Sequence, residues 1–108
     1  MRISTHVVEA RTGSGASGVP VVLEFHTGGE EWRFLGSGIT DENGQIRQLI
    51  LAEFEPVAGV YRMTFDTSGM AGTVPRTVLT LRVNHPYRNY HIPLVLRAQE
   101  EVTLHDVL

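Results

Sequence analysis

The stretch V-Y-R-M-T-F-D (residues 60–66) is the clearest β-strand signal in this chain. Its large apolar residues, Tyr61, Met63 and Phe65, alternate with polar ones, as in a strand with one buried and one solvated face. Similar runs recur at residues 2–9, 20–27, 31–38, 45–51, 76–83 and 90–96, and a last short one is expected in the tail, at 100–108. No segment shows the 3.6-residue period of an amphipathic helix. The sequence therefore predicts an all-β fold, an antiparallel sandwich of about eight strands with at most one short helix.

Turn residues separate these runs. Gly, Ser and Pro dominate residues 11–20, and Asn43-Gly44 is the strongest hairpin signal in the chain. In the run at 45–51, Ile46 and Ile50 are expected on one face and Leu49 on the other. With 108 residues the chain is long enough for one core, so we expect a single domain spanning residues 1–108.

Composition excludes several classes of protein. The basic residues are all Arg, 9 in number against 12 acidic ones, and they are scattered, which argues against a nucleic-acid-binding face. There is no Cys, which excludes disulfides, a thiolate nucleophile and a zinc–thiolate centre. No apolar run is long enough to span a membrane, and the first residues lack the apolar region of a signal peptide. We therefore expect a soluble protein of the cytoplasm.

Two histidines stand on the polar faces of predicted strands. His6 lies opposite the face of Ile3 and Val7, and His91 lies opposite the face of Ile92 and Leu94. Imidazole titrates near neutral pH, so such residues can transfer protons, although a packing role at a surface or interface is the plainer interpretation of either one alone. A metal site of His6, His91 and Asp106 is chemically reasonable, but no close His pair supports it, so neither metal nor cofactor is expected. His26 and His85 are expected in exposed turns.

Four segments carry a resemblance to a known family. S-T-H-V-V-E (4–9) resembles the motif S-T-H-V-L-D, and G-I-T-D-E-N-G-Q (38–45) resembles T-T-D-x-D-G-R. G-V-Y-R-M-T-F-D-T (59–67) resembles G-x-Y-x-L-x-F-D-T, and N-Y-H-I-P-L-V-L (89–96) resembles H-Y-H-V-P-L-L-L. In this order they are similar to the signatures of the transthyretin-like family, whose enzymatic members are 5-hydroxyisourate hydrolases of purine metabolism.

This resemblance implies a prealbumin-type sandwich that assembles into a homotetramer, a dimer of dimers with its active sites in a channel between facing sheets. It also implies that His6, His91 and an Arg activate a water and position the substrate, so that the water opens the six-membered ring at a carbonyl. The carrier branch of the family, transthyretin itself, has no need for the two histidines.

The chain departs from the family pattern at two places. The family Arg falls on Gln45, and Arg47, two residues further on the same strand face, is the expected substitute. The family's terminal Y-R-G-S falls on residues 104–107, where His105 and Asp106 stand instead. We therefore expect His6, His91 and Arg47 as catalytic residues and Gln45, Pro93, His105 and Asp106 as substrate contacts. One of the last pair could instead orient a histidine, and a frayed polar terminus is the plainer alternative.

The sequence thus predicts a hydrolase of the 5-hydroxyisourate type that acts on a small heterocycle or cyclic amide. A family member that serves another small molecule in specialised metabolism is one alternative. A non-catalytic small-molecule carrier is the other.

Overall fold

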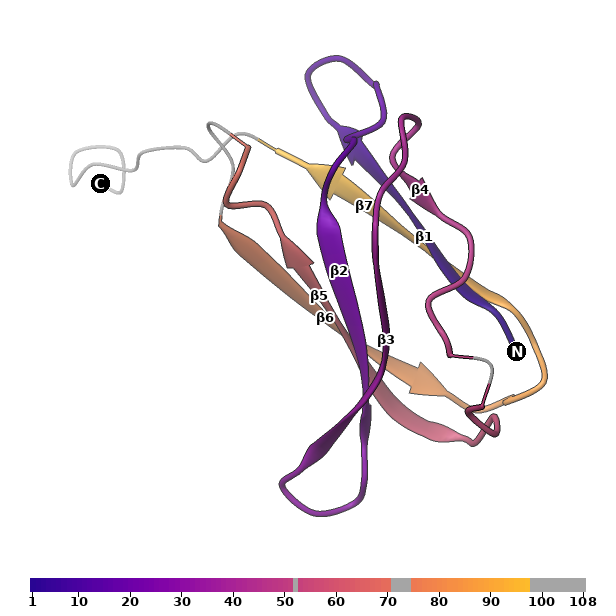
Figure 1. The fold of residues 1–108 in the computed structure, drawn as a ribbon. Coiled ribbons are helices and arrows are strands. Elements are labelled where there is room, and N and C mark those ends of the chain that lie inside the picture. The colour runs from indigo at the N-terminus through magenta and orange to yellow at the C-terminus, as the bar shows by residue number, and fades with distance from the viewer. Residues whose placement is uncertain (52, 71–74, 98–108) are drawn as a thin grey trace, which may run out of the picture.

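A computed structural model describes residues 1–51, 53–70 and 75–97 of the chain. It contains seven strands: β1 (Ile3–Glu9), β2 (Pro20–His26), β3 (Trp32–Ile39), β4 (Gln45–Ile46), β5 (Gly59–Asp66), β6 (Arg76–Val83) and β7 (Tyr90–Leu96). Figure 1 shows them as two layers, with β1, β4 and β7 in one sheet and β2, β3, β5 and β6 in the other. The predicted β-sandwich is confirmed.

The two sheets differ in strand direction. The four-stranded sheet has the order β3-β2-β5-β6 and is antiparallel throughout, with a bulge between Leu23 and Glu24. The three-stranded sheet has the order β4-β1-β7, in which β1 pairs antiparallel with β4 but parallel with β7. The prediction of antiparallel pairing alone was therefore wrong for one strand pair. Parallel neighbours need a long crossover, and most of the chain lies between β1 and β7.

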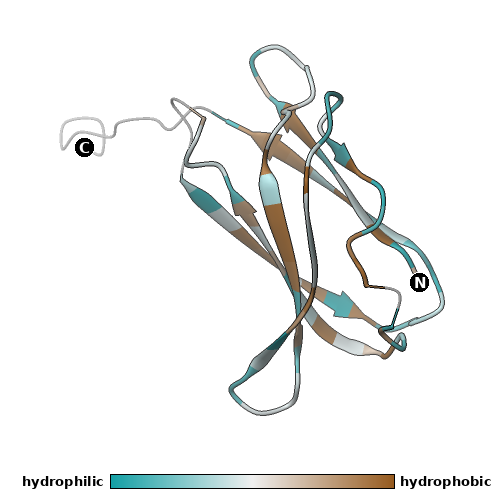
Figure 2. Ribbon diagram, in the orientation of Figure 1, coloured by the Kyte–Doolittle hydropathy of each residue, from teal (hydrophilic) through white to brown (hydrophobic). Residues whose placement is uncertain are grey.

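The core lies between the sheets and is built by the alternating residues of the strands. Figure 2 shows that most hydrophobic segments lie on the strands, interrupted there by more hydrophilic ones. Tyr61, Met63 and Phe65 are fully buried, as predicted, and so are Ile3 and Val7. The Tyr61 hydroxyl donates a hydrogen bond to the Val57 carbonyl at 2.6 Å, which satisfies its polar group beside the core.

The stretch at 45–51 departs from its prediction as one strand. Strand β4 ends at Ile46, and the chain then bends, so the two-residue period is lost. Leu49, expected on the face opposite Ile46, is instead buried in the same core. Its amide donates to the Ile3 carbonyl at 2.9 Å, and the Gln48 side-chain oxygen accepts from the Ile3 amide at 3.2 Å. These bonds hold the segment beside β1 without a regular ladder.

The last predicted strand, at 100–108, lies outside the described residues. The described part of the chain has strands and turns but no helix, and the loop after Asp66 begins with a turn at Ser68–Gly69. None of its elements is therefore a helix long and apolar enough to cross a membrane.

Candidate functional site

The outer face of the β4-β1-β7 sheet brings the predicted site residues together. His6 pairs with Gln45 of β4 on one side and with Pro93 of β7 on the other. His91 pairs with Ser4, one step along the same face of β1. Since directly paired residues point to the same face of a sheet, all five side chains share the face turned away from the core.

His6 and His91 are diagonal neighbours on this face. Adjacent strands lie about 4.8 Å apart and a strand rises about 3.3 Å per residue, so two residues offset by one strand and two positions have Cα atoms about 8 Å apart. The imidazoles can therefore flank a small molecule without having to bond to each other. Between them, on the inner face, Thr5 is fully buried and its hydroxyl donates to the Ile92 carbonyl at 2.6 Å, which ties β1 to β7.

A shallow hollow of about 270 Å³ opens on this face. Its lining residues are Arg2, Ser4, Thr5, Gln45, Ile46, Arg47 and His91. Arg47 follows β4 directly and is exposed, and Arg2 lies just before β1, so two guanidinium groups border the same hollow. Positive charge beside an imidazole favours an anionic ligand or a developing oxyanion.

Among the residues that the structure describes, each histidine ring of this site has one hydrogen-bond partner. His6 Nε2 lies 2.9 Å from the Asn43 carbonyl oxygen, and His91 Nδ1 lies 2.9 Å from the Ser4 hydroxyl. Neither ring is buried: His6 is half-buried and His91 is exposed. The rings are therefore oriented by the protein and still accessible to a ligand.

The turn from Asp41 to Gln45 positions the carbonyl that holds His6. One Asp41 carboxylate oxygen accepts from the Asn43 and Gln45 amides, both at 2.9 Å, which lowers the pKa of Asp41, with the Gln45 bond as the largest cause. The positive charges of Arg47 and His6 act in the same direction. Gly44 has φ of +80°, and a Cβ there would collide with the Val7 carbonyl oxygen, so this turn requires glycine.

The structure brings together five of the seven predicted site residues: His6, Gln45, Arg47, His91 and Pro93. His105 and Asp106 lie outside the described residues, and Asp106 is also the third member of the alternative metal site. Sequence reasoning missed Arg2 and Ser4, although the two-residue period of the strand places both on the His6 face. It also missed the Asn43 carbonyl, for which residue identity gives no signal.

Comparison with known proteins relates the chain to a family. The chain matches the model of the HIUase/Transthyretin family over residues 3–99. It is 31% identical over 100 residues to the 5-hydroxyisourate hydrolase of Salmonella dublin, covering 87% of this chain and 72% of that protein. It is 30% identical over 108 residues to the uric acid degradation bifunctional protein of Arabidopsis thaliana, covering 87% of this chain. The match spans only 33% of that longer protein.

Solved structures of a transthyretin and of a hydrolase share the fold. Sea bream transthyretin, solved in complex with thyroxine, superposes with a TM-score of 0.78 at 27% identity, covering 93% of this chain and 90% of that one. The 5-hydroxyisourate hydrolase of Klebsiella pneumoniae superposes with a TM-score of 0.72 at 22% identity, covering 93% of each chain. The fold alone therefore does not separate the two activities, but with the family match it settles the relationship: this chain belongs to the HIUase/Transthyretin family.

Proposed function

We propose that this chain is a hydrolase that opens the ring of 5-hydroxyisourate or of a closely related cyclic amide. The observation that carries the proposal is the placement of His6 and His91 as diagonal neighbours on one outer sheet face, beside Arg47. A relative named as a 5-hydroxyisourate hydrolase, at 31% identity, supports the same reaction class.

The chemistry needs a base, an acid and a positive charge. One imidazole takes a proton from water, and the water oxygen bonds to a ring carbonyl carbon. The Arg47 guanidinium stabilises the negative charge that develops on the carbonyl oxygen. The ring C–N bond then breaks, and its nitrogen takes a proton from the other imidazole. Gln45 and Pro93, which flank His6 on both sides, contact the substrate.

We further propose that a second subunit completes the site, in a homotetramer whose sheets face each other across a channel. A hollow of about 270 Å³ is small beside ligand sites of roughly 300–1,000 Å³. Next to the polar cluster, Val8 pairs with Val95, which is 49% exposed and offers an apolar contact for a facing sheet. The tetramer and the cytoplasmic location stay predictions.

A carrier or a repurposed family member is the alternative. Gln45 stands where the hydrolase motif has Arg, and sea bream transthyretin, solved with thyroxine, shares the fold at 27% identity. A small-molecule carrier would bind a ligand in the same channel but would not consume it.

One assay separates these possibilities. 5-Hydroxyisourate is generated in situ, and its decay is followed spectroscopically with wild type, His6→Ala, His91→Ala and His85→Ala. We expect decay well above the spontaneous rate for wild type and for His85→Ala, since His85 is exposed and does not line the hollow. The His6 and His91 variants should lose most of the excess rate. Decay at the spontaneous rate with wild type would exclude this substrate.

A further inference from the structure

The two histidines of the site differ in the hydrogen-bond partner that holds each ring. His6 Nε2 lies 2.9 Å from the Asn43 carbonyl oxygen. A carbonyl oxygen only accepts hydrogen bonds, so Nε2 must carry the proton of this bond. In the neutral ring that leaves Nδ1 as the nitrogen with a free lone pair. His6 therefore gains and loses a proton at Nδ1.

His91 is held at the other nitrogen and by a different kind of group. Its Nδ1 lies 2.9 Å from the Ser4 hydroxyl, and a hydroxyl can accept the Nδ1 proton. Within the described residues, His91 Nε2 has no protein partner, and the ring lines the hollow. The nitrogen that faces a ligand at His91 is therefore Nε2.

The holding groups are themselves fixed by the fold. The Asp41 carboxylate closes the turn at 41–45, and the Gly44 carbonyl accepts from the Val7 amide at 2.7 Å, so the Asn43 carbonyl is locked beside β1. Asp41 also interacts electrostatically with His6, and this interaction is one of the causes that lower the pKa of Asp41. Ser4 is aligned with His91 by the parallel register of β1 and β7.

We propose that the two imidazoles use opposite nitrogens: His6 is the base through Nδ1, and His91 is the acid through Nε2. Asp41 and Ser4 act as positioning residues. In the reaction, water gives a proton to His6 Nδ1 while its oxygen bonds to the carbonyl carbon. The C–N bond breaks, and the leaving nitrogen takes a proton from Nε2 of a charged His91, which keeps its second proton on Nδ1 against Ser4. This assignment of roles rests on the proposed hydrolase function, whereas the positions of the ring protons do not.

Long-range ¹H–¹⁵N correlation spectra of the labelled protein test the ring protons without any substrate. They are recorded at a pH where the imidazoles are neutral, and signals are assigned by their loss in His6→Gln and His91→Gln. We expect His6 in the Nε2–H form and His91 in the Nδ1–H form, whereas the exposed His85 should show a mixture of these two forms. The same form at both sites, or an Nδ1–H form at His6, would overturn the proposal.

The positioning residues are tested with matched variants. Ser4→Ala should move the His91 signals toward the His85 mixture and lower kcat about 10-fold with KM unchanged, a loss similar to that for groups that orient metal-binding histidines. Ser4→Thr, which keeps the hydroxyl, should restore both. Asp41→Ala should move the His6 signals, whereas Glu42→Ala, its exposed neighbour at the tip of the turn, should not. An unchanged His91 spectrum in Ser4→Ala would refute the role of Ser4.

The two proposals fail in different ways. One outcome is that wild type does not act on 5-hydroxyisourate while the spectra place the ring protons of His6 and His91 on different nitrogens. In that case the proposed hydrolase function is wrong and the assignment of the ring protons is correct. If wild type is active and both rings have the same form, the proton assignment alone is wrong. Should Asp41→Ala fail to fold, the wild-type spectra and the Ser4 pair still decide the question.

Discussion

The outer faces of the two sheets both carry cationic and ring-bearing side chains, but the contacts of these side chains differ between the two faces. On the four-stranded sheet, Arg62 Nη2 lies 2.8 Å from Glu24 Oε1, and the same guanidinium carbon is 4.0 Å from the centre of the Trp32 ring. His26 packs against Trp32 with ring centroids 4.9 Å apart. On the three-stranded sheet, His6 and His91 each make one hydrogen bond within the described part of the chain, and His91 also lines a hollow. On the four-stranded sheet the cationic and aromatic side chains contact one another, whereas on the three-stranded sheet the imidazoles are accessible to a ligand.

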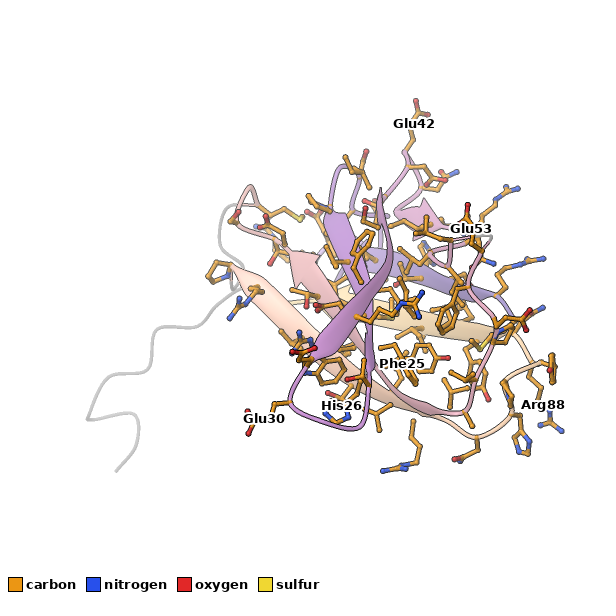
Figure 3. All side chains as sticks on the ribbon, turned by 60° about the horizontal axis from the view of Figure 1, so that its bottom comes forward. Phe25, His26, Glu30, Glu42, Glu53 and Arg88 are labelled. Atoms are coloured by element: carbon orange, nitrogen blue, oxygen red, sulfur yellow. The ribbon has the colours of Figure 1, made fainter. Side chains whose placement is uncertain are left out.

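This difference separates side chains that bind one another from side chains that are accessible to a ligand. Arg62 meets a carboxylate and an aromatic ring inside the chain, so a ligand would have to compete with both. Within residues 1–51, 53–70 and 75–97, His6 and His91 are each hydrogen-bonded at one ring nitrogen and have no protein partner at the other. Figure 3 shows His26 beside Glu30 at one end of the molecule, with Glu42, at the tip of the turn that holds His6, at the opposite end. Function is therefore expected on one face and stability on the other.

The largest expected effect compares one histidine from each face. His91→Gln should lower kcat for ring opening by about 10²–10⁴-fold, the range for loss of a general acid or base. His26→Gln, on the other sheet, should leave kcat within about twofold. Steady-state kinetics on freshly generated 5-hydroxyisourate give both values. Equal losses in the two variants would show that the faces do not differ in function.

A second comparison pairs one arginine from each face. Arg47→Ala should lower kcat about 10²-fold, because a charge that stabilises the developing oxyanion is removed. Arg76→Ala, which lies beside Val78 on the outer face of the other sheet, should have no effect on the rate. Single-turnover measurements compare the chemical step in both. Full activity of Arg47→Ala would leave Arg2, the other guanidinium at the hollow, as the source of the charge.

The sequence predicted the fold well because alternation is a local signal. In β5 and β7 the two-residue period alone identifies the buried residues, such as Met63 and Leu96. The same period fails after Ile46, because the chain bends there and Leu49 turns into the core. It also cannot give strand direction, so the parallel pairing of β1 with β7 had to come from the structure.

The candidate site was predicted in part, for a related reason. Side chains that carry chemistry, such as His6 and His91, can be recognised by residue type and motif. The groups that orient them are a backbone carbonyl at Asn43 and a hydroxyl 87 positions away in sequence from His91. His26, predicted in an exposed turn, ends β2 instead and packs on Trp32, a cross-strand contact fixed by register. Such pairings depend on tertiary structure rather than on local pattern.

A smaller effect is expected from the stabilising face. Arg62→Ala removes a partly exposed ion pair and a contact with the Trp32 ring, which together stabilise the fold by about 1 kcal/mol. Thermal unfolding should show Tm lower by about 5 °C, with kcat unchanged. Arg82→Ala, exposed on the neighbouring strand β6, is the matched control and should change stability by less than about 0.5 kcal/mol. A loss of activity without loss of stability would contradict the division between the faces.

The smallest effect concerns the turn that holds His6. The pKa of Asp41 is lowered in the folded chain, chiefly by the Gln45 amide, so its carboxylate supports the turn fully above the unfolded value of about 3.9 and loses that support as the pH falls through the lower folded value. Amide chemical shifts of Asn43 and Gln45 should therefore show an acid transition with its midpoint below the unfolded value of about 3.9. In Asp41→Asn this transition should be absent. A midpoint at or above the unfolded value would mean that the carboxylate does not hold the turn, and the Asn43 carbonyl would then lack the support on which the orientation of His6 depends.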